Sequence, residues 1–261
     1  MSDSESGDDY DLDAGPDPAG FAAAAPEAAT DDERPVHAVG IGPGNPEFLT
    51  PRGARAIREA DVVVGFGTVA DFAREAVDAD TDWLTCGYRD EGETLATFAE
   101  RVADGDDGTA VLMGDPNHSG YQFVGKVQRA VDRPVRVVPG ISSLQVAASR
   151  SRTPMEDGEF VTLHKSGDLA PDLARLRAAG DDRHLLVLPR PYDWMPGDVA
   201  ADLLDAGADG DRTALVCERL THADEEITRT TLADLATHAG GDGEGDTPFS
   251  DLSVLVVRAA E

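Results

Sequence analysis

Three glycine-bearing stretches hold the residues of this chain that are best suited to chemistry. They lie at 40–44, 114–120 and 139–143, and each directly follows an apolar run. Glycine lets a backbone approach a ligand closely, because no Cβ stands in the way. In a sheet of parallel strands, the loops after the strands meet at one edge, which is a common place for a bound cofactor. We therefore expect the three loops to form one ligand site.

The first loop fits neither of the two common phosphate-binding patterns. The dinucleotide pattern Gly-x-Gly-x-x-Gly needs a third glycine where Asn45 stands, with Gly44 one place early, and the phosphate loop needs a lysine that is absent here. Taken alone, this loop is as consistent with a structural turn as with a binding site. The two further loops of the same kind favour the site.

Alternating strands and helices must position these loops. Thr50 suits a helix N-cap and Pro51 the first helical turn, so a helix is expected directly after the first loop. In the first half of the chain we expect strands over 36–41, 61–65, 83–84, 109–113 and 135–138, and helices over 50–60, 68–77, 91–103, 121–131 and from 143 to about 150. This alternation predicts an α/β domain with a mainly parallel sheet.

The second half of the chain alternates in the same way, but its pattern favours a more mixed sheet. We expect strands over 159–163, 184–188, 213–217, 225–230 and 252–257, and helices over 171–179, 196–206 and 232–238. Residues 1–34 are Asp, Glu, Ser, Gly, Pro and Ala with almost no core-forming residues, which predicts a disordered acidic tail. The predicted organisation is therefore a tail over 1–34, an N-terminal α/β domain over 35–152 and a C-terminal α/β domain over 153–261.

The charge of the chain is strongly negative. The 22 Lys and Arg residues against 51 Asp and Glu give 22 − 51 = −29, and the only lysines are Lys126 and Lys165. Nucleic acid is an unsuitable partner, because phosphate contacts need clustered basic residues. Excess carboxylates with little lysine indicate the hydrated surface of a halophile, whose salt screens the self-repulsion.

The two cysteines and the apolar runs exclude several other classes of protein. Cys86 and Cys217 are far apart with no Cys-x-x-Cys pattern, so we expect buried free thiols and neither a zinc site nor a disulfide framework. No apolar run approaches the length of a membrane span, and the acidic N-terminus is not a secretory signal. The expectation is a soluble, cytoplasmic protein that does not bind membranes.

Three segments of the chain match the motifs of a known family in order and spacing. They are GIGPGNPEFLT at 40–50, VLMGDPNHSG at 111–120 and VVPGISSLQVAAS at 137–149. On these segments the chain resembles the tetrapyrrole methylases, which transfer methyl groups from S-adenosylmethionine to cobalamin and sirohaem precursors. The resemblance covers 36–258 and implies two α/β domains with the cofactor in the cleft between them, a homodimer, and a carboxylate-rich tetrapyrrole substrate. It implies no protein-bound metal, because cobalt would arrive inside the substrate.

Further segments resemble one branch of this family. They are ISSLQVAASR at 141–150, TLHKSG at 162–167, VCERLTHADEEI at 216–227 and FSDLSVLVVR at 249–258. They resemble the branch that methylates C5 of cobalt-precorrin-7, the C5 half of precorrin-6Y C5,15-methyltransferase. The decarboxylating C15 half would then be a separate protein and a partner. The alternatives are a methylase of another ring position, a diphthine synthase and, in a different class, a catalytically silent protein that binds cofactor or tetrapyrrole.

The resemblance also assigns residues to the cofactor site. Asp115 would favour the positive charges of the cofactor, although an aspartate at this place can also cap a turn. Ser142 and Ser143 equally suit the N-cap of the following helix. The full set of implied cofactor-binding residues is Gly42, Pro43, Gly44, Met113, Gly114, Asp115, His118, Ser142 and Ser143.

The remaining candidates concern the substrate and the proton. A substrate with many carboxylates needs positive groups to bind it. The candidates at predicted loop ends are Arg52, Arg89, His164, Lys165, Arg190 and Arg219. Each of them also suits an exposed surface without a ligand.

Methyl transfer depends on alignment of the reacting atoms, so no catalytic triad is expected. The catalytic residue is unknown, and His118 and His164 are candidates for accepting the proton lost from the methylated carbon. The other histidines, His37, His184, His222 and His238, are expected to be structural or surface residues.

Overall fold

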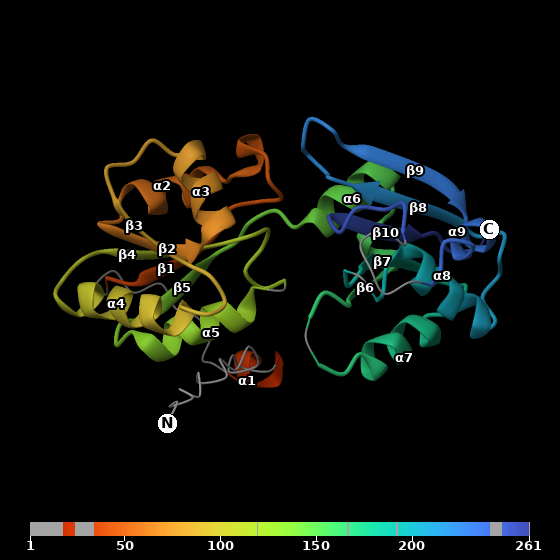
Figure 1. Cartoon of the computed structure of the whole chain (residues 1–261), viewed down its shortest axis with the longest axis horizontal. Helices are drawn as coiled ribbons and strands as arrows, with labels where there is room; N and C mark the ends of the chain where they lie inside the picture. The colour runs from red at the N-terminus through yellow and green to blue at the C-terminus, as the bar shows by residue number, and fades with distance from the viewer. Residues whose placement is uncertain are drawn as a thin grey trace, which may run out of the picture. The chain divides into compact units, whose positions relative to one another are not determined.

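The chain folds into two α/β units, each built on a five-stranded sheet (Figure 1). The computed structural model describes residues 18–23, 34–118, 120–165, 167–191, 193–240 and 247–260. Unit 1 comprises Met1–Ile41 and Leu49–Gly140, and unit 2 comprises Gly42–Phe48 and Ile141–Glu261. This confirms the predicted fold class.

The sheet of unit 1 is entirely parallel. Its strand order is β3-β2-β4-β1-β5, which makes β3 an edge strand, as predicted. The order places β4, β1 and β5 side by side, and these are the strands that precede the three glycine loops. The strands are β1 (Val36–Gly40), β2 (Val62–Phe66), β3 (Asp82–Cys86), β4 (Gly108–Leu112) and β5 (Val135–Val138).

Helices cover both faces of this sheet (Figure 1). The helices α2 (Pro51–Arg58) and α3 (Gly67–Ala76) lie on one face, and α4 (Glu91–Ala103) and α5 (Tyr121–Ala130) lie on the other. Successive side chains of a strand point to opposite faces, so a strand covered on both sides must be apolar throughout. This explains why β2 (VVVGF) has no polar residue and why β1 (VHAVG) has only His37. The predicted cap of α2 is present, with Thr50 Oγ1 accepting from Gly53 N at 3.1 Å.

Unit 2 has a mixed sheet, as predicted. Its order is β6-β7-β10-β8-β9; β6 and β7 are parallel, and every other pair is antiparallel. Since β10 runs against both β7 and β8, the carboxyl ends of β6, β7 and β8 lie at the same edge. The strands are β6 (Gly158–Thr162), β7 (His184–Leu188), β8 (Thr213–Glu218), β9 (Glu226–Thr231) and β10 (Ser253–Val257).

The helices of unit 2 explain where the boundary between the units falls. Helix α6 (Ser143–Ser151) covers one face of the mixed sheet, where Leu144 and Val146 pack with Leu186 and Val256. The division therefore lies at 140/141, before this helix, whereas 152/153 was predicted. The opposite face is covered by α7 (Ala170–Ala178), α8 (Pro196–Asp205) and α9 (Leu232–Ala236) (Figure 1).

The predicted acidic tail lies mostly outside the described residues. Its described part includes the helix α1 (Pro18–Ala22), which the composition did not predict. Phe21 packs against Tyr121 at the start of α5, with ring centroids 5.8 Å apart. A residue of the tail therefore makes an aromatic contact with α5, which the polar composition of the tail did not predict.

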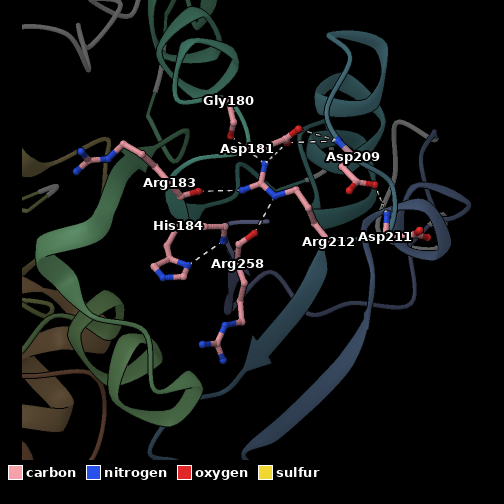
Figure 2. Close-up of polar contacts among 9 residues, drawn as sticks. Gly180, Asp181, Arg183, His184, Asp209, Asp211, Arg212 and Arg258 are labelled. Carbon is pink, nitrogen blue, oxygen red and sulfur yellow. Dashed lines mark hydrogen bonds and ion pairs between the residues drawn. The ribbon is translucent and has the colours of Figure 1, made fainter. Parts of the chain in front are cut away.

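Arg212 is the buried polar centre of unit 2 (Figure 2). Its side chain is 0% exposed. Its guanidinium donates to the carbonyl oxygens of Arg258, Gly180 and Arg183 at 2.7, 2.9 and 2.9 Å, and to Asp181 Oδ1 at 2.9 Å. These partners precede β7 and follow β10, so Arg212 holds together the edge opposite the carboxyl ends of β7 and β8.

We expect Arg212→Met to lower the free energy of unfolding by about 3 kcal/mol, because it leaves buried carbonyl oxygens without donors. Urea unfolding of both variants at one salt concentration measures this. The control is Arg175→Met, which removes a 56% exposed guanidinium paired with Glu159 and should change stability by less than about 1 kcal/mol. Equal effects of the two substitutions would contradict the stabilising role of Arg212.

Candidate functional site

The backbones of three loops meet at the carboxyl ends of β4, β1 and β5. A Cβ added to Gly140 would lie 2.1 Å from Gly114 O, and one added to Gly40 would lie 2.5 Å from the same oxygen. Only glycine fits at such a distance, because any side chain would overlap the neighbouring backbone. The predicted convergence of the three loops is thus confirmed within unit 1.

Asp115 connects two of these loops. Its Oδ2 accepts from Gly140 N at 3.1 Å, and its Oδ1 accepts from Asn117 N at 2.8 Å. Gly114, directly before it, has φ +63°, a conformation that favours glycine. The carboxylate therefore caps its own turn and ties the loop after β4 to the loop after β5. This is the turn-capping role that the sequence left open for Asp115.

Two other predicted cofactor residues lie in the loop after β4. Met113 is 50% exposed, which is a large fraction for an apolar residue of its size. Burial lowers the pKa of His118, and the nearby Asp115 opposes that shift. A neutral imidazole at neutral pH can accept a proton, so His118 keeps the chemical property for which it was proposed.

The remaining glycines of the first loop belong to unit 2. Gly42 and Gly44 have φ +84° and +116°, so the backbone there takes a course that side chains disfavour. The loop is held by the turn between β8 and β9: Asn45 Nδ2 donates to Thr221 O at 3.0 Å, and Thr221 Oγ1 donates to Pro43 O at 3.5 Å.

His222 covers this loop, which the sequence analysis did not foresee. A Cβ added to Gly44 would lie 2.4 Å from His222 Nε2, so the imidazole occupies the space that a side chain at Gly44 would need. The signal available in the sequence was the position of His222 inside the segment 216–227. Its residue type alone indicated only a structural or surface histidine.

Ser142 takes the N-cap role that the sequence allowed. Its Oγ accepts from Leu144 N at 3.3 Å, and Gln145 Oε1 accepts from Ser142 N at 2.8 Å, which together form a capping box at α6. Ser143 is the first residue of that helix. Both serines therefore fix where the loop after β5 ends.

Four of the predicted substrate-binding residues lie at the carboxyl edge of the mixed sheet. His164 and Lys165 follow β6, Arg190 follows β7, and Arg219 follows β8. Burial lowers the pKa of His164, and Asp251 opposes that shift. The structure thus brings to one edge of the sheet residues that span 219 − 164 = 55 positions of the sequence.

Carboxylates of the chain itself accompany the charged side chains at this edge. Lys165 Nζ lies 2.6 Å from Asp172 Oδ2, Arg190 Nε donates to Asp193 Oδ1 at 2.8 Å, and Arg219 Nε lies 2.8 Å from Asp224 Oδ2. Beside Arg219 lies a pocket of about 550 Å³, with Glu226, Thr228, Phe249, Ser250 and Asp251 in its lining. The edge therefore combines cations, anions and space for a polar ligand.

Arg52 and Arg89 are not part of this group. Both belong to unit 1, where Arg52 Nη2 donates to His37 Nε2 at 3.1 Å and Arg89 is exposed in the loop between β3 and α4. The predicted set of substrate-binding residues is therefore divided between the two units.

The described residues offer neither a cluster of metal ligands nor a membrane-spanning helix. Within the described ranges, no group of three or more His, Cys, Asp or Glu side chains could hold a metal ion. Over the same part of the chain, no helix is both long enough and apolar enough to cross a bilayer. Both cysteines are buried as predicted, and burial raises the pKa of Cys86 to about 11 and that of Cys217 to about 12.

Known proteins of similar sequence are methyltransferases. A sequence profile of the tetrapyrrole (corrin/porphyrin) methylases matches residues 35–236. The probable cobalt-precorrin-7 C(5)-methyltransferase of Methanocaldococcus jannaschii is 28% identical over 230 residues, which cover 87% of this chain and 99% of the relative. The cobalt-precorrin-4 C(11)-methyltransferase of the same organism is 24% identical over 225 residues, 82% of this chain and 85% of the relative.

A solved structure shares the fold. The uroporphyrin-III C-methyl transferase of Thermus thermophilus, crystallised with S-adenosyl homocysteine, aligns with a TM-score of 0.62 at 22% identity, over 86% of this chain and 92% of that one. At this identity the likeness concerns the fold alone.

We expect Gly140→Ala to destabilise the chain by about 2 kcal/mol, because the new Cβ would press on Gly114 O and force the two loops apart. Urea unfolding measures the change. The control is Gly92→Ala in α4, where a Cβ meets nothing within 4 Å and should raise stability by up to about 1 kcal/mol. A harmless Gly140→Ala would contradict the close contact of the loops.

Burial lowers the pKa of His118 and His164, so both should titrate below about 6.5, the ordinary value for imidazole. An NMR titration of the imidazole protons measures this, with His118→Gln and His164→Gln identifying the signals. As the pH falls below about 6.5, the unfolded chain binds these protons first, so the wild type should lose stability relative to each variant. Titration midpoints at or above 6.5 would contradict the lowered pKa of the two side chains.

Proposed function

Because the chain belongs to the tetrapyrrole (corrin/porphyrin) methylase family, we propose that it transfers a methyl group from S-adenosylmethionine to C5 of cobalt-precorrin-7. The family consists of methyltransferases that use S-adenosylmethionine, and the relatives most similar to this chain include enzymes of cobalamin biosynthesis. The choice of C5 is supported by one observation above all: the similarity to a probable C5 enzyme extends over 99% of that relative. The segment 216–227, whose turn holds the loop 42–48, belongs to the same resemblance.

The geometry of the loops fits a cofactor of this kind. Gly42 and Gly44 present backbone without a Cβ in conformations that favour glycine, and the bare backbones of Gly40, Gly114 and Gly140 meet one another. When bound, S-adenosylmethionine supplies an electrophilic methyl group on a sulfonium that is already a good leaving group. The proposed contacts remain Gly42, Pro43, Gly44, Met113, Gly114, Asp115, His118, Ser142 and Ser143.

We propose that side chains of the protein bind and orient the tetrapyrrole substrate and remove the proton lost from the methylated carbon. Arg190 and Arg219 offer planar guanidinium groups that can take a substrate carboxylate by two hydrogen bonds. Lys165 offers a point charge at the same edge, and Arg52 and Arg89 remain further proposed contacts. We propose His164, whose pKa burial lowers, as the group that accepts a proton at an imidazole nitrogen, and His118 is the second candidate.

The assembly and setting follow from the same proposal. We propose a homodimer, as the resemblance to the family implies. We also propose a salt-rich cytoplasm, because a chain with a formal charge of −29 needs screening to remain compact. Decarboxylating methylation at C15 is assigned to a separate partner protein. Methylation of C11 is the second candidate function, supported by the similarity to the cobalt-precorrin-4 enzyme over 82% of this chain.

The test is an anaerobic assay in concentrated KCl with S-adenosylmethionine carrying a ¹³C-labelled methyl group. Cobalt-precorrin-7 and cobalt-precorrin-4 are offered in separate reactions, and calorimetry with S-adenosylhomocysteine tests cofactor binding independently. We expect one labelled methyl at C5 of cobalt-precorrin-7, with every carboxylate retained, because the C15 activity is proposed to belong to another protein. Mass spectrometry and ¹³C NMR identify the product and the position.

The other results distinguish the alternatives. Transfer only to cobalt-precorrin-4 would replace C5 by C11 as the methylated position. Cofactor binding without transfer to any tetrapyrrole would favour a catalytically silent protein.

A further inference from the structure

We propose that Glu225 is a positioning residue for the loop 42–48, acting through Thr221. The proposal rests on the proposed function, in which Gly42, Pro43 and Gly44 contact S-adenosylmethionine. All the residues involved belong to unit 2.

Glu225 makes three interactions in the turn between β8 and β9. Its Oε1 accepts from Arg150 Nε at 2.6 Å and its Oε2 from Arg150 Nη2 at 3.4 Å, so a residue of α6 anchors the carboxylate. Its Oε2 also accepts from Thr221 N at 2.7 Å. The hydrogen bond from Arg150 lowers the pKa of Glu225, which keeps the carboxylate ionised as an acceptor.

Thr221 is held in a conformation that its side chain disfavours. Its φ is +72°, in the left-handed region, and a β-branched residue there is a true outlier. Such a conformation persists only when the surroundings impose it. The hydrogen bond from Thr221 N to Glu225 Oε2 is the constraint that comes from outside the contacts with the loop, and it fixes the N–H of the strained residue.

The strained conformation aims two groups of Thr221 at the loop. Its carbonyl oxygen accepts from Asn45 Nδ2 at 3.0 Å, and its hydroxyl donates to Pro43 O at 3.5 Å. Asn45 in turn accepts from Glu47 N through Oδ1 at 2.9 Å, so its amide is fixed at both ends. The conformation of Thr221 therefore determines where the loop lies.

A purely stabilising role would give a different result. Glu225 and Arg150 are partly exposed, and ion pairs of this kind contribute little to folding. Removing the carboxylate should leave the chain folded and relax Thr221, which then releases Asn45 and Pro43. The loss would thus fall on cofactor affinity and much less on stability.

The test is a double-mutant cycle on the full chain, with S-adenosylhomocysteine binding measured by calorimetry. We expect Glu225→Ala and Asn45→Ala each to weaken binding about tenfold. The double variant should bind no more weakly than the weaker single variant, because both break the same connection. Glu225→Gln keeps an acceptor for Thr221 N and should restore affinity to within about threefold of the wild type.

The matched control is Asp202→Ala in α8. It removes the carboxylate that pairs with Arg177 of α7. Its affinity should equal that of the wild type. Kinetics should show a raised KM for S-adenosylmethionine in Glu225→Ala with kcat within about twofold, as expected when a loop is misplaced before the chemical step.

Two results would overturn the proposal. They are wild-type affinity in Glu225→Ala, and a double variant whose loss equals the product of the two single losses. In either case the wild type still binds the cofactor, so the proposed function stands. A wild-type chain that does not bind S-adenosylhomocysteine would instead refute the proposed function and this role of Glu225 together.

Discussion

The direct contact of three backbones at the carboxyl edge of the first sheet is the constraint on which the rest of the structure depends. Gly40 and Gly140 leave no room for a Cβ against Gly114 O, and the three glycines lie at or just beyond the ends of three different strands. They can meet only if β4, β1 and β5 are neighbours, which is the observed order. Asp115 then completes the arrangement by accepting from the backbone of Gly140. The glycines that mark the loops in the sequence thus also explain the order of the strands.

The secondary structure was accessible from the sequence because local patterns determine it. Apolar runs such as Val62–Val64 predicted strands, their alternation with helices predicted a mainly parallel sheet, and Thr50 predicted the start of α2. The boundary between the units was not accessible, because it depends on which sheet α6 covers. That is decided by contacts of Leu144 with residues such as Val256, more than a hundred positions away. The helix α1 was missed for a similar reason, since Phe21 gains its partner only from α5.

The candidate site could be predicted in its parts but not in its connections. The loops were recognisable from glycine, and the residue types of Lys165, Arg190 and Arg219 indicated cations at loop ends. Their partners were not recognisable, because 51 acidic residues offer too many choices for pairing by sequence alone. The contact between Asn45 and Thr221 joins residues 176 positions apart, so no local pattern contains it. A similar separation, 222 − 44 = 178 positions, concealed the contact between His222 and Gly44, because a histidine alone indicates no particular partner.

The turn between β8 and β9 links the two kinds of site within unit 2. Two of its residues, Arg219 and Thr221, have φ +46° and +72°, although neither is glycine. Arg219 lines the pocket of about 550 Å³, while Thr221 bonds to the loop 42–48. Strain of this kind persists where the surroundings impose it, and it concentrates at functional sites. One short turn thus presents a guanidinium to the pocket and a carbonyl oxygen to the glycine loop. The place proposed for the tetrapyrrole carboxylates and the loop proposed for the methyl donor therefore share a backbone segment.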